Sequence, residues 1–342
     1  MNKIQNHIEI VRSTSLALSS LSQASCDAIF AVLSHHYTDV GISIVNNLTD
    51  LERLVSKQPD LAFMGMKYLP GITFPIWISD YLETYGIAHT GSGQPAIEFE
   101  LNKPLAKQRV FDAGISTAAF VVVKIGQTFT NKGFLLDFPV FVKPANLGGG
   151  QGINAHSVAH NFQELSSQVN SVMAECGTDI LVEEYLPGRE FSVAVLANEH
   201  TDELLCLPIE LVAPGNDQGE LILSEVVKAS NEEVVLAVND LQTRAAITDC
   251  AAQVFNALGA SDYGRIDIRL DASGSPHFLE ANLIPSLIDG YGSFPKACAL
   301  NVDMDYETMI LRIVRLGLGS PLPAEEPDTE ADLAALFGAA SV

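Results

Sequence analysis

The sequence predicts an α/β unit followed by an α+β unit, which together form three subdomains. Up to about residue 100, short apolar runs alternate with helical stretches, the pattern of a parallel sheet with helices on both faces. From Ile180 to Ile284 strands dominate, interrupted by one amphipathic helix from about Asp240 to Leu258 that ends at Gly259. A chain of 342 residues that is 47% hydrophobic is sufficient for two or three cores.

The expected elements follow the apolar runs in chain order. The first unit has strands at 8–11, 42–45 and 61–66 and helices at 19–36, 48–57 and 75–85. The next has a helix from Asn102 to about Gly114, strands at 118–123 and 140–145, and a helix from about Val158. We expect an N-terminal domain at 1–100, a central subdomain at 101–179 and a C-terminal subdomain at 180–318. Residues 319–342 are acidic and Pro-rich, typical of a solvated tail, with a short helix expected at 331–337.

The charge balance excludes several classes of partner. The chain has 42 Asp and Glu against 19 Lys and Arg, a formal net charge of −23, so we expect no broad basic face for nucleic acid or an anionic membrane. The five cysteines form no CxxC pair, which is typical of buried thiols in a reducing compartment. The N-terminus is too polar for a signal peptide, and no apolar stretch is long enough to span a membrane. We therefore expect a cytoplasmic protein in which a few cations hold any anionic ligand.

The most informative segment, 264–282, contains two alternating strands around a Gly-containing turn. In an antiparallel hairpin with this turn, Asp267 faces Glu280 and Arg265 faces Asn282, all on one face. Opposed carboxylates repel unless a cation lies between them, and with an amide oxygen beside them they suit Mg²⁺. The alternative is an ordinary solvated polar face. Arg269, on the same face, is either functional or in a surface ion pair with Asp267 or His277.

Two further segments offer groups to a nucleotide. Lys143 ends an apolar strand before the glycine loop 146–152, whose backbone N–H groups can approach an anion; because the lysine comes first, this is not a P-loop. A second apolar strand runs into Glu183 and Glu184, with Glu190 beyond, and carboxylates accept hydrogen bonds from an adenine amino group or a ribose. Each segment alone is also typical of a flexible turn or a common acidic strand-turn-strand.

Together these segments resemble the ATP-grasp ligases and, within them, the D-alanine–D-alanine ligase group. The shared features are the Lys-Pro strand with its glycine loop, Glu-Glu-x-x-x-Gly-x-Glu at 183–190, and Arg-x-Asp followed by Glu-x-Asn. The stretches that begin at His89, Asn102 and Ala113 are also similar to that group, and the resemblance extends from about residue 86 to 300. It implies an ATP-grasp fold with an N-terminal parallel α/β domain.

The resemblance also implies roles for the matching residues. Lysines contact the ATP phosphates, the glycine loop closes over them, the acidic segment holds adenine and ribose, and a further lysine contacts the γ-phosphate. The ATP-binding residues are Lys103, Lys143, Gly149, Gly150, Gln151, Gly152, Glu183, Glu184, Tyr185, Leu186, Glu190 and Lys228. Mg²⁺, or Mn²⁺ in its place, is held by Asp267, Glu280 and Asn282. Arg265 and Lys228 are catalytic, with Arg265 stabilising charge on the reacting acyl group.

The implied activity is ATP-dependent ligation of a carboxylate to an amine. The γ-phosphoryl group moves to the carboxylate, and the amine attacks the acyl phosphate to give an amide, ADP and phosphate. The substrates are small carboxylates and amines such as amino acids or a peptide. The glycine loop acts as a lid because acyl phosphates hydrolyse. The resemblance further suggests a homodimer through the N-terminal region.

The sequence departs from the group in the substrate-binding segments. The group's Glu-Arg-Glu-Val-Ser-Leu, whose first Glu holds the ammonium of D-alanine, corresponds to Leu16-Ala-Leu-Ser-Ser-Leu here. The Gly-Ser-Ser loop corresponds to Gly148-Gly-Gly-Gln, and the His-Gly and Gly-Glu-Asp-Gly segment to Gly65-Met-Lys-Tyr-Leu-Pro-Gly. Without the ammonium partner, a site discriminates against a zwitterionic donor. We therefore expect a ligase of altered substrate, in which Lys67 and Arg12 are either ligands of a substrate carboxylate or surface cations.

Two alternatives stay open. One is an authentic D-alanine–D-alanine ligase with relocated substrate contacts, which an assay with D-alanine decides. The other, from a different class, is a non-catalytic ATP-binding sensor or scaffold. Loss of the metal and phosphate residues would indicate a sensor, and here Lys143, Asp267, Glu280 and Asn282 are all present.

Overall fold

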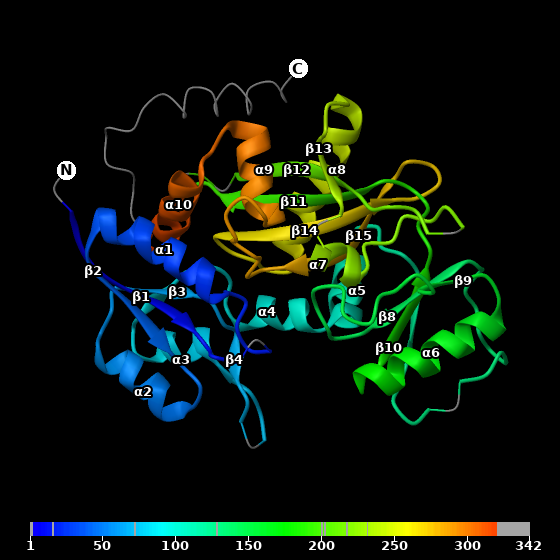
Figure 1. Cartoon of the computed structure of the whole chain (residues 1–342), viewed down its shortest axis with the longest axis horizontal. Helices are drawn as coiled ribbons and strands as arrows, with labels where there is room; N and C mark the ends of the chain where they lie inside the picture. Colours follow the sequence, from blue (N-terminus) through cyan, green and yellow to red (C-terminus); the bar gives the residue numbers. More distant parts are fainter. Residues whose placement is uncertain are drawn as a thin grey trace.

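The computed structural model describes residues 3–319 except 16, 72, 128, 200, 202, 217 and 231, so the expected tail lies outside the described residues apart from Gly319. The chain forms three sheets and a small hairpin (Figure 1). The N-terminal sheet is parallel, in the order β2-β1-β3-β6. Its strands are β1 (Ile4–Arg12), β2 (Tyr37–Ile44), β3 (Leu61–Met64) and β6 (Ala88–His89).

Helices cover both faces of this sheet, as the alternating pattern predicts. Neighbouring residues of β1 enter different cores: Ile10 packs with α1 (Gln23–His36), and Val11 packs with α2 (Leu48–Ser56) and α3 (Ile78–Thr84). A hairpin of β4 (Tyr68–Leu69) and β5 (Ile76–Trp77) extends from the carboxyl end of β3. The carboxyl ends of β1 and β3 therefore lie side by side at one edge of the domain.

The central subdomain begins after two helices, α4 (Gln94–Leu101) and α5 (Lys103–Asp112). Its antiparallel sheet has the order β7-β10-β8-β9 and is covered by α6. The strands are β7 (Phe120–Val123), β8 (Val140–Pro144), β9 (Val158–Ala159) and β10 (Ile180–Glu184), and α6 is Phe162–Cys176. Because β10 is hydrogen-bonded between β7 and β8, the boundary expected at residue 180 would divide this sheet. We propose a boundary in the turn after Glu184.

The C-terminal sheet is antiparallel and has the order β13-β12-β11-β14-β15. Its strands are β11 (Glu190–Ala197), β12 (Leu204–Val212), β13 (Val234–Ala237), β14 (Tyr263–Leu270) and β15 (Pro276–Asn282). Helix α8 (Leu241–Ala257) packs on one face, and α9 (Ser293–Val302) packs on the other. Helix α10 (Tyr306–Leu318) packs against α9, α1 and the N-terminal strands β3 and β6. Gly259 follows α8 with φ 65°, as expected for its C-terminal stop. The expectation of a single helix in this region was wrong, because α7 (Glu225–Ser230) also forms.

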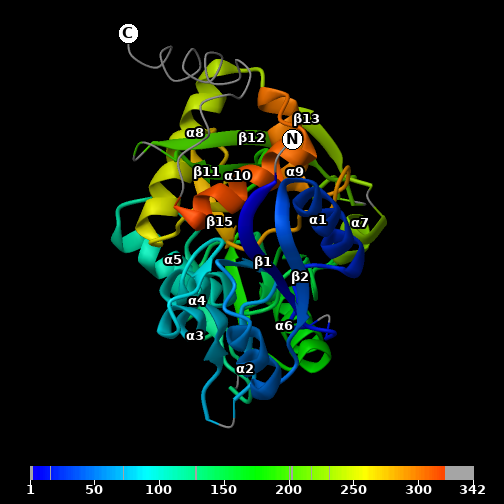
Figure 2. The ribbon, with the colours of Figure 1, turned by 90° about the vertical axis from the view of Figure 1, so that its left-hand side faces the viewer.

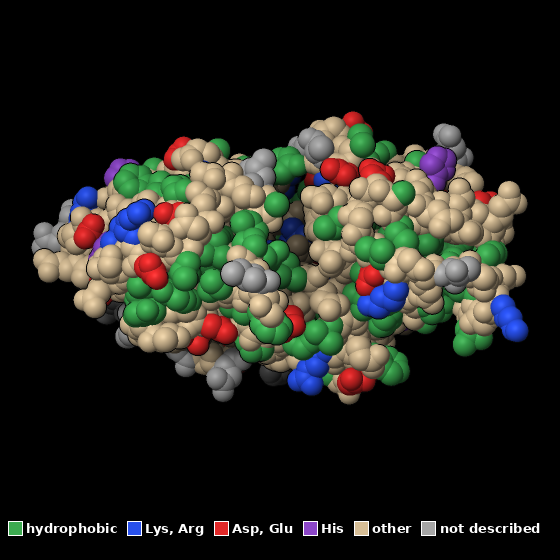
Figure 3. Space-filling model, turned by 90° about the horizontal axis from the view of Figure 1, so that it is seen from below, with side chains coloured by type: hydrophobic (Ala, Val, Ile, Leu, Met, Phe, Trp, Pro, Cys, Tyr) green, Lys and Arg blue, Asp and Glu red, His purple; other side chains and the backbone are tan. Residues whose placement is uncertain are grey.

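Two hydrophobic cores run from the N-terminal sheet into the C-terminal sheet, whereas the central sheet has a core of its own. Figure 2 shows the N-terminal strands directly below β11 and β12. Seen from below, the molecular surface is hollowed between the N-terminal and central parts, and cationic side chains lie inside the hollow (Figure 3). None of the helices in the described part of the chain is long and apolar enough to span a bilayer.

Candidate active site

Strands β14 and β15 bring the predicted metal residues together. Arg265 pairs with Asn282, and Asp267 pairs with Glu280, so the predicted register is confirmed for this half of the hairpin. An irregularity after Asp267 places Ile268 opposite Phe278 and shifts the register by one residue towards the turn. The four polar residues of the site thus stand on regular, paired strands.

Asp267 is at the centre of this polar face. Its carboxylate accepts Arg265 Nε at 3.0 Å and Nη2 at 2.8 Å, Ser192 Oγ at 2.7 Å, and Asn282 Nδ2 at 3.2 Å. Two opposed carboxylates with an amide beside them are hard oxygen donors, which suit Mg²⁺ when substrate oxygens complete its shell. The predicted ligands therefore fit such an ion chemically. No group of three or more His, Cys, Asp or Glu side chains in the described chain could hold a metal ion, so the candidate set is limited to these two carboxylates and the Asn282 amide.

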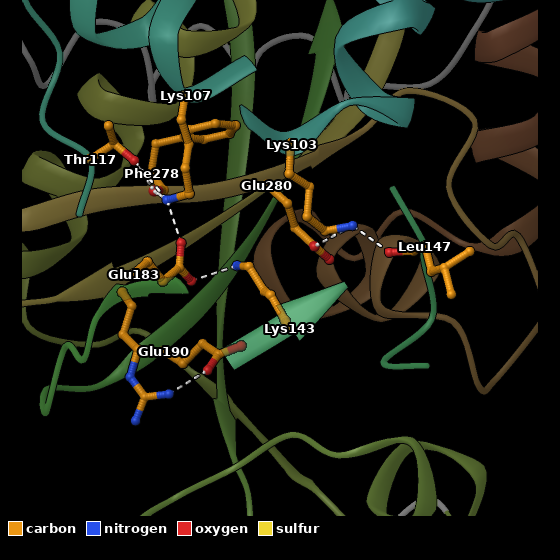
Figure 4. Close-up of polar contacts among 10 residues, drawn as sticks. Lys103, Lys107, Thr117, Lys143, Leu147, Glu183, Glu190, Phe278 and Glu280 are labelled. Atoms are coloured by element: carbon orange, nitrogen blue, oxygen red, sulfur yellow. Dashed lines mark hydrogen bonds and ion pairs between the residues drawn. The ribbon is translucent and has the colours of Figure 1, made fainter. Parts of the chain in front are cut away.

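Glu280 lies among lysines. Lys103 Nζ is 3.6 Å from Glu280 Oε2 and also donates to the carbonyl of Leu147, next to the glycine loop (Figure 4). Burial would raise the pKa of Glu280, but Lys103, Lys228 and Lys143 outweigh it and lower the pKa to about 2. The carboxylate is therefore ionised. An ionised carboxylate beside three lysines is an arrangement that can hold a cation and phosphate groups together.

Glu183 is buried between two lysines, with Lys143 Nζ at 2.6 Å and Lys107 Nζ at 2.9 Å (Figure 4). Lys107 is fully buried and also donates to Thr117 Oγ1 at 2.9 Å and to the carbonyl of Phe278 at 3.4 Å. Burial raises the pKa of Glu183, but the two lysines outweigh it and hold the pKa below its usual value. The sequence reasoning did not select Lys107. The sequence feature that could have identified Lys107 is its four-residue spacing from Lys103, which places both lysines on one face of α5.

Arg269 is a second residue whose partner lay far away in sequence. It is 6% exposed, its Nη1 is 3.0 Å from Glu190 Oε2, and its guanidinium lies 5.2 Å from the ring centroid of Tyr185. The expected surface ion pair with Asp267 or His277 was wrong, because β14 faces β11 on its other side and Glu190 begins β11. Burial raises the pKa of Glu190, against the opposing effects of Arg269 and Lys228. Arg269 thus joins two of the predicted nucleotide residues.

The glycine loop packs closely on its surroundings. Gly149, Gly150 and Gly152 have φ values of 67°, 82° and 71°, conformations that L side chains rarely adopt. A Cβ on Gly150 would lie 3.4 Å from Lys228 Cδ, and one on Gly152 would lie 2.7 Å from Pro144 Cγ. The loop therefore spans from the end of the Lys143 strand to Lys228 in α7.

A cavity between the central and C-terminal sheets unites most of the predicted nucleotide residues. Those that line it are Lys143, Glu183, Glu184, Tyr185, Leu186, Glu190 and Lys228. The predicted metal ligands Asp267 and Glu280 and the buried Arg269 also line it. Lys103 adjoins it through Glu280, and Gln151 lies exposed in the loop. A larger cavity, of about 580 Å³, opens beside the β4–β5 hairpin. Its cation, Lys124, is paired with Asp179 at 2.7 Å, so the groups that suit phosphate converge on the first cavity.

Comparisons with known proteins show the family of this chain. The family described as "D-ala D-ala ligase C-terminus" matches residues 110–315. The chain belongs to this family. It is 29% identical over 282 residues to the D-alanine–D-alanine ligase of Desulfotalea psychrophila, covering 81% of this chain and 84% of the relative. It is 31% identical over 249 residues to the enzyme of Chlorobaculum parvum, covering 70% and 66%.

A solved structure shares the fold over most of the chain. The Bacillus anthracis D-alanine–D-alanine ligase complexed with ATP aligns with a TM-score of 0.69 at 18% identity, over 92% of this chain and 97% of that one. As a member of the D-alanine–D-alanine ligase family, the chain is an ATP-grasp ligase of the type that forms carbon–nitrogen bonds. The predicted ATP-grasp fold with an N-terminal parallel α/β domain is confirmed.

Two of the departing segments, residues 16–21 and 65–71, lie in the N-terminal domain, before the matched region, whereas the departing loop at 148–151 lies within it. Lys67 is not a surface cation: its Nζ is 2.7 Å from Glu100 Oε1, and both side chains are largely buried. Arg12, at the end of β1, is also buried. Leu16, where the group has its ammonium-binding Glu, lies outside the described residues.

Proposed function

We propose that this protein joins a carboxylate to an amine through an acyl phosphate, using ATP and Mg²⁺, on substrates other than two D-alanines. The observation that carries the proposal is the convergence of Lys103, Lys143 and Lys228 on the face of Asp267 and Glu280. Phosphoryl transfer to a carboxylate brings two anions together, and lysines and a metal ion reduce that repulsion.

Each side chain has a separate task in this reaction. Asp267, Glu280 and Asn282 would hold Mg²⁺, which neutralises phosphate charge when bound. Lys143 and Lys103 lie where they can donate to phosphate oxygens, and the glycine loop excludes water from them. Arg265, fixed by two hydrogen bonds to Asp267, presents its remaining donors to the oxyanion that forms when the amine attacks. Glu190 and Tyr185, held by Arg269, would receive the ribose and the base.

Residues of the N-terminal domain support an altered substrate. The motif that holds a substrate ammonium in the family is absent from this sequence, and the carboxyl ends of β1 and β3 present Arg12 and Lys67 instead. An ammonium group near these cations would lack a free carboxylate partner, because Glu100 is already paired with Lys67. The relatives named D-alanine–D-alanine ligase make D-alanine the necessary comparison substrate.

A phosphate-release screen tests the proposal. Wild-type protein with ATP and Mg²⁺ is given pairs of amino acids, including D-alanine alone, and Glu280→Gln is the matched control. We expect phosphate release only with particular pairs, D-alanine alone giving less, and Glu280→Gln reducing kcat by roughly 100-fold or more. Equal phosphate release by wild type and Glu280→Gln would contradict the assignment of Glu280 as a Mg²⁺ ligand. Fastest turnover with D-alanine alone would support the authentic ligase instead.

A further inference from the structure

Arg12 is a buried cation whose hydrogen bonds go to neutral atoms. Its side chain is at the end of β1, and the residue is 6% exposed. The guanidinium donates from Nε to the carbonyl of Ser13 at 3.2 Å, and from Nη1 to Gln23 Oε1. A guanidinium carries five N–H donors. Among the described residues, no carboxylate lies within ion-pair distance of it.

The other buried cations of the described chain differ from Arg12 in this respect. Lys103 pairs with Glu280, Lys107 and Lys143 pair with Glu183, and Arg269 pairs with Glu190. Burying a charge without a partner is costly, and proteins normally supply the partner. Arg12 therefore fits a site whose counter-ion comes from outside the chain.

The position of Arg12 in the sheet is also that of a ligand site. In the order β2-β1-β3-β6, the chain leaves β1 towards β2 and later returns on the other side at β3. Open α/β sheets bind ligands at such a switch point, outside the carboxyl ends of the strands. Helix α1, 14 residues long, begins beside Arg12 with Gln23, and its first turn contains no acidic residue. The partial positive charge of this helix end therefore adds to that of Arg12.

The same edge borders the ligase site. Figure 1 shows β1 running from the N-terminal edge towards the middle of the molecule. Lys67, just beyond β3, pairs with Glu100 at 2.7 Å, and Glu100 accepts the backbone N–H of Leu283 at 3.0 Å. Leu283 follows the predicted metal ligand Asn282 directly. A molecule bound at the switch point is thus next to the hairpin where the reaction is proposed.

We propose that the edge of the sheet at the carboxyl ends of β1 and β3 binds a carboxylate of the substrate, with Arg12 as its ion-pair partner. This carboxylate is distinct from the one that is activated, so the substrate class is a dicarboxylic acid, an acidic amino acid or a peptide with an acidic end. The inference rests on the proposed function, because it assigns the substrate of the same site.

The test is the binding of a series of straight-chain dicarboxylates, from malonate to adipate, to protein that holds Mg²⁺ and a non-hydrolysable ATP analogue. Calorimetry is run on wild type, Arg12→Met and Arg12→Lys. Arg53→Met is the matched control, because Arg53 is exposed and paired with Asp50 on α2. We expect at least about tenfold weaker binding of the best dicarboxylate in Arg12→Met, a smaller loss in Arg12→Lys, and no change in Arg53→Met.

Affinity for the ATP analogue, measured in each variant, separates this inference from the proposed function. An unchanged affinity in Arg12→Met shows that the variant is folded and that the loss is local. Equal dicarboxylate binding by wild type and Arg12→Met would overturn the inference. So would phosphate release by wild type with neutral amino acids when no dicarboxylate binds, although the ligase function would then stand. Failure of wild type to bind the ATP analogue would instead contradict the proposed function.

Discussion

At the residue scale, the site is organised by buried ion pairs between distant segments. Lys107 in α5, Glu183 in β10 and Lys143 in β8 form one row, and Arg269 in β14 holds Glu190 in β11. Sequence motifs identified Lys143, Glu183 and Glu190, because their local spacing carries information. They did not identify Lys107 or the partner of Arg269, because these pairings depend on which strands and helices become neighbours.

Lys107→Met tests this row. The substitution leaves Glu183 buried with one lysine instead of two, and removing one partner of a buried pair costs about 3 kcal/mol. We expect this decrease in the free energy of unfolding by urea denaturation. In Lys107→Met/Glu183→Gln the two losses should not add, because Lys107 and Glu183 are in direct contact and each single change already removes their interaction. Additive losses would show that the two residues do not interact.

At the element scale, the hairpin and the glycine loop show what local sequence can and cannot specify. The alternation of polar and apolar residues predicted the pairing of Asp267 with Glu280. The register shift between Asp267 and Ile268 was not predictable from the turn alone; it places Ile268 opposite Phe278, and both side chains belong to the core. Likewise, β10 pairs with β7 and β8 and so belongs to the central sheet. Its apolar run predicts a strand but does not specify which strands are its neighbours.

The glycine loop offers a matched pair of substitutions. Gly149 and Gly152 both have positive φ, but a Cβ on Gly149 meets nothing within 4 Å, whereas one on Gly152 lies 2.7 Å from Pro144 Cγ and 2.9 Å from Cys176 Sγ. We expect Gly149→Ala to cost about 1 kcal/mol from backbone strain, and Gly152→Ala to cost about 3 kcal/mol because the loop must also move. Thermal unfolding and the KM for ATP are the measurements. Equal changes in thermal stability and in the KM for ATP would contradict the close packing of Gly152 against Pro144 and Cys176.

At the scale of the whole molecule, two cores join the N-terminal and C-terminal sheets, while the central sheet has a separate core. This division suits a central subdomain that moves as a lid over a fixed base. Asp262, directly before β14, links the C-terminal sheet to the connection between β6 and α4. Its carboxylate accepts a hydrogen bond from the backbone N–H of Gly91 at 2.7 Å. The alternating pattern predicted the sheets, but not that two of them share cores.

Asp262 gives the fold a predictable pH dependence. Burial raises the pKa of Asp262 from 3.8 to about 6. Between these values the folded protein keeps a proton that the unfolded chain releases, so the free energy of unfolding falls as the pH rises, by about 3 kcal/mol in total. Asp262→Asn keeps an oxygen acceptor for Gly91 and removes the charge.

We expect Asp262→Asn to be more stable than wild type at pH 7, with a difference that shrinks towards pH 4. Urea unfolding across this range measures it. A difference that stays constant with pH would show that Asp262 does not titrate in this window.

The central claim is that a carboxylate substrate is activated as an acyl phosphate on the face of Asp267 and Glu280. Isotope transfer tests it most directly. A pair of substrates that supports turnover is supplied with ¹⁸O in the carboxylate, and the released phosphate is analysed by mass spectrometry. The account predicts one labelled oxygen in each phosphate formed, because the bond between the carboxylate oxygen and phosphorus survives attack of the amine on carbon. Unlabelled phosphate accompanying amide formation would contradict it.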